Sequence, residues 1–210
     1  MIDFVHIPKN AGTSIGELCG EGSFITYHGH GKDPDTLEGE QLVVLRDPKD
    51  RFCSAVRFSL AYMREEYSDK FKIFETHNLM DPSSWAEVLA NREHVHHDLV
   101  NSEVCNIQHK VGNTLLSDKW TYAPQHIWFD RCRSPRVALF HELADDMRYL
   151  FVSMDRECNI PHENATCNKK DVELSNIAHE YLEEKYEKDI VIFNKYKTMS
   201  REERMKRHVV

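Results

Sequence analysis

Hydrophobic residues gather in short runs along the chain, and polar turns separate these runs. Four runs have the length of strands, at residues 2–7, 23–28, 41–46 and 135–140. The third is continuously apolar from Leu42 to Leu45, which is typical of a strand covered on both faces of a parallel sheet. Helical periodicity in the segments between the runs predicts that strands alternate with helices. We therefore expect an α/β fold with a central, mainly parallel sheet flanked by helices in three layers.

Helix signals are clearest where a capping residue precedes an apolar stripe. Asp47 is a favoured N-cap and Pro48 a favoured first helical residue, and apolar residues then recur at helical spacing. Ser14 and Glu17 have the spacing of a capping box, within a helix expected at 13–19. Further helices are predicted at 82–90, 95–109, 142–158 and from 174 towards 193.

Composition and charge limit the class of protein. The formal net charge of the 210 residues is -8, so a general nucleic-acid or membrane-surface binder, which needs a dominant basic face, is not expected. No apolar run reaches the roughly 18 residues of a membrane helix. The six cysteines form no C-x-x-C pattern, and reduced thiols in a cytoplasm are the expected state. The chain, 1–210, fits a single domain whose charged tail at 200–210 is expected to fray.

The stretch from Pro8 to Ser14 joins the first strand to the first helix and suits an anion. A Pro/Gly loop that enters a helix directs unpaired backbone N–H groups, and the positive end of the helix dipole, at one point. Lys9 adds a mobile positive charge. Because this lysine precedes Gly12 and no G-x-x-x-x-G-K-[ST] sequence is present, the loop is not a Walker A motif. Taken alone, the stretch also fits a plain strand–turn–helix connection.

Polar side chains also follow the second and third predicted strands. His28 and His30 end the second run among glycines, and Arg46 ends the third. In an open parallel sheet, ligands bind at the carboxyl ends of the strands. The alternatives are surface histidines, and a salt bridge from Arg46 to Asp47 or Asp50.

Two further groups of residues have ordinary explanations. Trp120, Tyr122 and Trp128 have the shape to stack against a sugar ring, but aromatic residues of this size more often belong to the core, which is the interpretation we favour. A second group consists of histidines and one cysteine, which are residue types that bind zinc. Their spacing matches no familiar set of zinc ligands, so we expect solvated helix faces and no metal site. Its members are His94, His96, His97, Cys105 and His109.

Three separated stretches together resemble one family, the sulfotransferases that use 3′-phosphoadenosine 5′-phosphosulfate (PAPS). The stretch from Phe4 to Ser14 resembles the family's 5′-phosphosulfate-binding loop, in the form HIPK-x-AGTS of Golgi carbohydrate sulfotransferases. The stretch from Val44 to Ser54 resembles the 3′-phosphate motif RDP-x-x-R-x-x-S. Residues 27–30, Tyr-His-Gly-His, are similar to the histidine pair of the uronyl 2-O-sulfotransferases. Residues 139–146 and 186–189 are weaker landmarks of the same family.

The resemblance implies a P-loop-like fold and a set of functional residues. In the resembling family, the arginine and serine of the second motif, here Arg46 and Ser54, bind the 3′-phosphate. Lys9 would stabilise the leaving group, and His30, or else His28, would be the general base, with no metal required. The implied cofactor-binding residues are Pro8, Lys9, Asn10, Ala11, Gly12, Thr13, Ser14, Arg46 and Ser54. A polar loop at 159–170 falls where such enzymes often close over the cofactor.

The resulting hypothesis is an enzyme that moves a sulfonate group from PAPS to a hydroxyl group, with a carbohydrate as the expected acceptor. The product of the donor is 3′-phosphoadenosine 5′-phosphate (PAP). One alternative is a nucleotide-dependent phosphotransferase, for which Asp47 is a candidate metal ligand. Another is a non-catalytic glycan-binding protein on the same fold.

The acceptor and the compartment are left open by the sequence. A polyanionic glycan would need a concentrated basic groove, for which Arg131, Arg133 and Arg136 are candidates; a less charged oligosaccharide or a small hydroxylated metabolite is the other possibility. Because the chain begins at the first strand, without the anchor usual in Golgi members, we expect a cytoplasmic protein of bacterial or viral type. If a longer eukaryotic protein has been trimmed, the Golgi lumen is expected instead.

Overall fold

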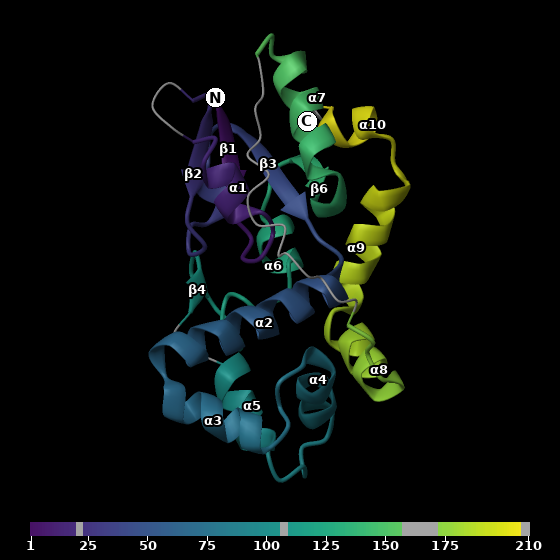
Figure 1. The fold of residues 1–210 in the computed structure, drawn as a ribbon. Coiled ribbons are helices and arrows are strands. Elements are labelled where there is room, and N and C mark those ends of the chain that lie inside the picture. The colour runs from purple at the N-terminus through teal and green to yellow at the C-terminus, as the bar shows by residue number, and fades with distance from the viewer. Residues whose placement is uncertain (20–22, 106–108, 157–171, 207–210) are drawn as a thin grey trace.

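The computed structural model of the chain describes residues 1–19, 23–105, 109–156 and 172–206 (Figure 1). The sheet consists of β1 (Ile2–Val5), β2 (Ile25–His28), β3 (Glu40–Leu45) and β6 (Arg136–Leu139), and a hairpin consists of β4 (Lys110–Val111) and β5 (Thr114–Leu115). The helices are α1 (Gly12–Gly16), α2 (Pro48–Glu66), α3 (Ser68–Thr76), α4 (Pro82–Ala90), α5 (His97–Val104), α6 (His126–Phe129), α7 (Leu143–Ser153), α8 (Asn176–Lys185), α9 (Glu187–Thr198) and α10 (Arg201–Met205). Two 3-10 turns are η1 (Pro34–Thr36) and η2 (Phe140–Glu142).

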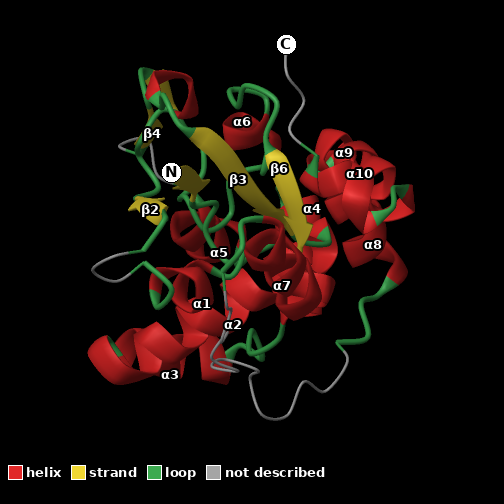
Figure 2. Ribbon diagram, turned by 90° about the horizontal axis from the view of Figure 1, so that it is seen from above, coloured by secondary structure: helices red, strands yellow, loops and turns green. Residues whose placement is uncertain are grey.

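The four-stranded sheet is parallel throughout, with the order β2-β1-β3-β6. Phe4 of β1 pairs with Tyr27 of β2 and with Leu42 of β3, and Val43 pairs with Val137 of β6. Figure 2 shows β3 and β6 side by side with helices around them. The expected α/β fold with a mainly parallel central sheet is therefore confirmed. Because β2 and β3 lie on opposite sides of β1, the strand order reverses between β1 and β3, where ligand crevices form in open sheets.

Both faces of the sheet are buried, as the apolar run of β3 predicts. Successive side chains of a strand point to opposite faces, so Leu42 and Val44 pack with α1, α7 and α10, whereas Val43 and Leu45 pack with α6, α9 and the hairpin. Trp128 of α6 belongs to the second of these clusters and is almost fully buried. Helices on both faces therefore exclude water from the sheet.

A third apolar cluster lies beyond the sheet and is built from helices. It joins α2 to α3, α4, α5 and α8, and it contains the buried rings of Trp85 and Tyr122. Figure 1 shows α2 between the sheet and the group formed by α3, α4 and α5. The prediction that Tyr122 and Trp128 are core residues is confirmed, while Trp120 is only half-buried.

Several predicted boundaries were wrong. The helix expected at 95–109 ends at Val104, because Cys105 forms an isolated bridge with Asp118. The helix expected from 174 to 193 is divided at Tyr186, which closes α8 and precedes α9. Helices α3 and α6 and the hairpin were not predicted. These short elements carry little periodic signal of their own, and their apolar residues face the clusters described above.

The tail does not fray over the described residues. Ser200 and Glu203 form a capping box at the start of α10, and Arg204 and Met205 are buried. The polar loop predicted to close over the cofactor, with Asn164, Thr166, Lys169 and Lys170, lies outside the described residues. Within the described ranges, every helix is too short or too polar to cross a membrane.

Candidate functional site

The loops that follow β1, β2 and β3 meet at the carboxyl edge of the sheet. They carry Lys9, His30 and Arg46, which the sequence singled out separately. Two of these loops are in direct contact, because Nη1 of Arg46 donates to the carbonyl oxygen of Lys9 over 2.9 Å. His6, at the end of β1, lies beside the third: its ring centroid is 4.1 Å from that of His30. The fold thus brings residues that are far apart in sequence close together, at the edge of the sheet where the strand order reverses between β1 and β3.

The loop between β1 and α1 has a strained backbone that its neighbours hold in place. Lys9 and Ala11 have φ angles of 67° and 61°, in the left-handed region that side chains other than glycine rarely adopt. The carbonyl of Pro8 accepts a hydrogen bond from Nε of Arg51 over 2.9 Å. Since Arg51 is almost fully buried and also donates to two other carbonyls, it fixes the loop against α2. Arg51 lies within the RDP-x-x-R motif, but the sequence analysis assigned it no separate role.

Asn10 is buried and anchors the same loop through hydrogen bonds. Its Nδ2 donates to the carbonyl of Val44 over 2.7 Å and to Oε1 of Gln125. Gln125 in turn accepts from the backbone N–H of Arg46 and donates to its carbonyl. The Oδ1 atom of Asn10 is buried and has no hydrogen-bond partner among the described residues. Asn10 therefore joins the loop after β1 to β3 and, through Gln125, to Arg46. One of its acceptors stays unpaired among the described residues, which is costly in a buried place.

Asp189 of α9 completes this support from the far end of the sequence. Its carboxylate accepts hydrogen bonds from the backbone N–H groups of Gln125 and His126, over 2.6 Å and 2.9 Å, and from Nδ1 of His126 over 2.8 Å. Asp189 is almost completely buried. Asp189 belongs to the stretch at 186–189, which resembles a family landmark. It thus fixes the position of Gln125, the residue that bridges Asn10 and Arg46.

Gly12 and His6 pack against each other without room for a side chain. A Cβ atom at Gly12 would collide with the imidazole of His6. The Nδ1 atom of His6 shares a short hydrogen bond with the hydroxyl of Tyr27. Burial, followed by the nearby charges of His30 and Lys9, lowers the pKa of His6 to about 3. Sequence reasoning gave His6 no role, although its place directly before Ile-Pro-Lys at a strand end was the signal that could have found it.

The Lys9 side chain is partly buried and lies over an aromatic ring of α2. Its Nζ is 4.2 Å from the ring centroid of Phe58. Burial, together with the positive charges of Arg46 and Arg51, lowers its pKa to about 8. A fixed phosphate or sulfate beside Nζ would oppose this effect, because an opposite charge favours the protonated amine. The lowered pKa reflects a partly buried amine beside two other cations.

The two histidines of the predicted pair have different surroundings. Nε2 of His28 is 2.8 Å from Oδ1 of Asp3, a buried residue in the middle of β1. His30 instead packs against His6 and Trp120, and its backbone carbonyl accepts from Nε1 of Trp128 over 2.8 Å. Burial lowers the pKa of His30, and the charges of Arg51 and His109 add to this effect, while the His6 carbonyl opposes it. The site therefore contains His30 as a neutral imidazole near pH 7, and His28 is engaged elsewhere.

Arg46 is held tightly, and Ser54 stands apart from it. The Arg46 side chain is 6% exposed, its Nε donates to Asp50 over 2.7 Å, and its guanidinium lies 4.1 Å from the ring centroid of Phe140. Ser54 is half-buried on α2 and shares no hydrogen bond with Arg46 in the described structure. The salt bridge from Arg46 to Asp50, which the sequence analysis gave as an alternative to a ligand-binding role, is therefore present.

The remaining loop residues lie at the start of α1. Ala11 is its N-cap and provides no side-chain cap, so the capping box predicted for Ser14 and Glu17 does not form. Thr13 is exposed in the first turn, and Ser14 is half-buried inside the helix. Glu17 is instead the C-cap of this five-residue helix.

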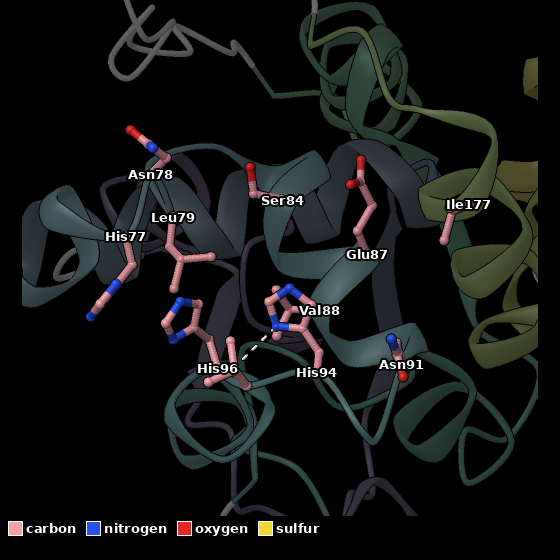
Figure 3. Close-up of a pocket in the computed structure, with 11 residues that line it drawn as sticks. His77, Asn78, Leu79, Ser84, Glu87, Val88, Asn91, His94, His96 and Ile177 are labelled. Carbon is pink, nitrogen blue, oxygen red and sulfur yellow. Dashed lines mark hydrogen bonds between the residues drawn. The ribbon is translucent and has the colours of Figure 1, made fainter.

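A cavity in the helical part of the molecule is lined by His94 and His96, two of the histidines that the sequence analysis considered as metal ligands. It has a volume of about 480 Å³ and lies between α4, the loops before α4 and α5, and α8. Figure 3 shows His77, His94 and His96 around it, with the backbone N–H of His96 donating to Nδ1 of His94 over 3.1 Å. No group of three side chains suited to a metal ion is found in the described ranges. None of the residues predicted for the cofactor site lines this cavity.

The three arginines considered for a basic groove are all paired within the chain. Arg131 donates to Asp33, Arg136 donates to Glu40, and Arg133 donates to the backbone carbonyls of Asp35 and Leu37. They therefore anchor the loops around β3, and carboxylates neutralise the charges of Arg131 and Arg136. Comparison of the chain with protein-family models, with curated proteins and with solved structures finds no match.

Proposed function

We propose that this protein is a PAPS-dependent sulfotransferase that moves a sulfonate group to a hydroxyl of a carbohydrate acceptor. The observation that carries the proposal is the hydrogen bond between Arg46 and the Lys9 carbonyl, over 2.9 Å. It joins the two stretches that resemble the 5′-phosphosulfate and 3′-phosphate motifs of one family. The parallel sheet with a loop after β1 and a basic residue after β3 agrees with the P-loop-like fold that the resemblance implies.

The residues of the loop suit the phosphosulfate end of such a donor. Lys9, Arg46 and Arg51 place three positive charges around the loop of an otherwise acidic protein. Gly12 lets the backbone lie directly on His6, so the loop stays free of side-chain bulk there. As sulfonate leaves, negative charge grows on the departing phosphate, and Lys9 is placed to stabilise it as a preorganised donor does at an oxyanion.

His30 is the residue best suited to the attacking end. An acceptor hydroxyl attacks sulfur as the bond from sulfur to the phosphate oxygen breaks, and the hydroxyl proton passes to a base. The lowered pKa of His30 keeps its imidazole neutral near pH 7, so it can accept that proton. His28 is bonded to Asp3, which favours a supporting role for it.

Arg46 is the proposed ligand of the 3′-phosphate, and its present partner is Asp50. A phosphate would replace or share this ion pair, because a bidentate contact to guanidinium is favourable. The phosphotransferase alternative finds less support, since the loop has no lysine after its glycine. The other alternative, a non-catalytic glycan-binding protein, would show no turnover on any acceptor, whereas the enzyme would.

The first test is calorimetric titration of the full chain with PAP, with adenosine 5′-phosphate as the control ligand. We expect micromolar binding that requires the 3′-phosphate. On an acceptor that the wild-type protein sulfates, Lys9→Ala should lower turnover by about 10²–10³-fold, the scale for loss of one oxyanion donor. The matched control is Lys32→Ala, an exposed lysine outside the loop. Folded protein that does not bind PAP would refute the proposal, and near wild-type turnover of Lys9→Ala would remove Lys9 from the mechanism.

A further inference from the structure

A row of three exposed aromatic rings begins at Lys9 and follows α2. Phe58, Tyr62 and Tyr67 are 51%, 49% and 54% exposed. The ring centroids of Phe58 and Tyr62 are 6.4 Å apart with planes 10° apart, and those of Tyr62 and Tyr67 are 5.7 Å apart and steeply inclined. The Nζ atom of Lys9 lies 4.2 Å from the Phe58 centroid. The aromatic row, defined by these three rings, is therefore continuous with the candidate site.

Phe58 and Tyr62 of the aromatic row continue the stripe of α2 that carries Asp50 and Ser54. Residues four apart lie on one face of a helix, so Asp50, Ser54, Phe58 and Tyr62 form a single stripe. The opposite face of α2 is fixed in the helical core by residues such as Phe52, Val56 and Met63. The rings consequently stand on a rigid support, and binding to them needs little ordering of the backbone.

Exposed aromatic rings in contact with one another are uncommon on a surface without a partner. Each ring offers a flat apolar face, and the tyrosines add hydroxyl groups at the rim. Hydrogen bonding between Tyr62 and Tyr67 raises the pKa of Tyr62. A ligand that matches such a surface has apolar C–H faces and hydroxyl groups at its edge, which is the chemistry of a sugar ring.

Charges of both signs lie along α2 beside the aromatic row. Arg57 and Arg64 share the helix with Glu65 and Glu66. The guanidinium of Arg64 lies 4.8 Å from the ring centroid of Phe71. The three arginines near β3 are held by contacts within the chain.

We propose that the aromatic row is the acceptor subsite and that it takes a neutral oligosaccharide. This inference rests on the proposed function for its link to catalysis, since a sugar on Phe58 has its hydroxyl groups beside Lys9. It goes further in naming the acceptor class and the residues that select it. It also explains why α2 exposes aromatic rings where a solvated helix face would be polar.

The test measures sugar binding in the absence of any nucleotide. The full chain is titrated with neutral tetrasaccharides of β-linked glucose and of β-linked N-acetylglucosamine, and with a sulfated heparin-type tetrasaccharide, by saturation-transfer NMR. We expect a neutral tetrasaccharide to bind, and Tyr62→Ala/Tyr67→Ala to weaken it at least tenfold. Tyr149→Ala, which removes an exposed ring of α7, should leave binding unchanged. Thermal melts verify that each variant is folded, as expected for exposed positions.

The inference would be overturned if both neutral probes failed to bind, or if neutral binding survived the double substitution. Preference for the sulfated probe, or dimerisation that the double substitution abolishes, would overturn it too. Loss of PAP affinity in the double variant would also count against it, because the row would then hold the nucleotide. If the wild-type chain binds the neutral sugar through the row but does not bind PAP, the proposed function fails and the sugar subsite stands.

Discussion

Lys9 combines three properties that rarely occur together in one residue. Its backbone is left-handed, its carbonyl is bonded to Arg46, and its amine is partly buried near two guanidinium groups. The arrangement costs energy in the free protein, both as backbone strain and as repulsion between like charges. An anion that enters the loop would remove the repulsion, so part of the free energy of binding has been stored in the fold.

The lowered pKa of Lys9 predicts how PAP affinity depends on pH. In the free protein the amine loses its proton above about pH 8. A bound phosphate raises this pKa, so binding above pH 8 takes up a proton and affinity falls as pH rises, by at most about tenfold per pH unit. Calorimetry from pH 7 to 10 in buffers of different ionisation enthalpy measures both effects. Lys9→Arg is the matched control, because arginine keeps its charge over this range. Equal slopes for the two proteins would contradict the assignment.

At the same scale, sequence reasoning identified charges better than contacts. Lys9 and Arg46 could be selected because a cation at a strand end is visible in the sequence, whereas the role of His6 depends on its contact with Gly12. The pairing of His28 with Asp3 depends on the register of β1 and β2, which no local pattern specifies. Side-chain partners across strands are therefore the part of the site that the sequence could not provide.

At the scale of elements, α9 supports the loop through a single carboxylate. Asp189→Asn replaces one acceptor oxygen with a donor that faces the N–H groups of Gln125 and His126. We expect the free energy of unfolding to fall by about 1–3 kcal/mol, the cost of losing charged hydrogen bonds in a buried place. Affinity for PAP should fall as well, because Gln125 bridges Asn10 and Arg46.

Urea unfolding and calorimetry measure these two effects. The matched control is Asp130→Asn, which removes an exposed ion pair with Lys188 and should change stability by less than about 0.5 kcal/mol. Loss of stability without loss of PAP affinity would show that α9 serves the fold and not the loop.

One sequence signal has different outcomes at α1 and α10. Ser14 and Glu17 share the S-x-x-E pattern with Ser200 and Glu203, yet only the second pair forms a capping box. At α1 the helix begins earlier, at Gly12, because the left-handed Ala11 turns the chain there. The pattern specifies which groups can bond, and the path of the backbone into the helix decides whether they do. By contrast, Asp47 caps α2 as predicted.

At the scale of the molecule, the end of the chain is tied to the last strand of the sheet. Arg204 donates to both carboxylate oxygens of the buried Asp146, over 2.8 Å and 3.0 Å, and Asp146 accepts from the backbone N–H of Leu139 over 2.8 Å. Nη1 of Arg136 in β6 donates to the carbonyl of Met205. The apolar runs predicted the parallel sheet and its buried faces, but they did not predict this closure, since a charged tail carries no apolar period.

Arg204→Ala should therefore destabilise the whole fold. The substitution leaves the buried Asp146 carboxylate with fewer partners, and loss of one partner of a buried ion pair lowers the free energy of unfolding by about 3–5 kcal/mol. Because Asp146 keeps its contact with Arg201, we expect a value at the lower end of this range. Chemical unfolding measures the change. Lys206→Ala, which breaks only an exposed pair with Glu202, is the control and should have little effect. Similar stability of the two variants would mean that α10 is an accessory segment.

The position of Lys9 over Phe58 has a consequence for the order of events. The amine covers one face of the first ring of the aromatic row, so the ring and an anion in the loop compete for the same side chain. When the anion attracts the amine, that face of Phe58 becomes available to the acceptor. By thermodynamic reciprocity, a sugar on Phe58 would then improve the affinity for the anion to the same degree. Steady-state kinetics would be sequential, and each ligand would lower the Kd of the other by the same factor.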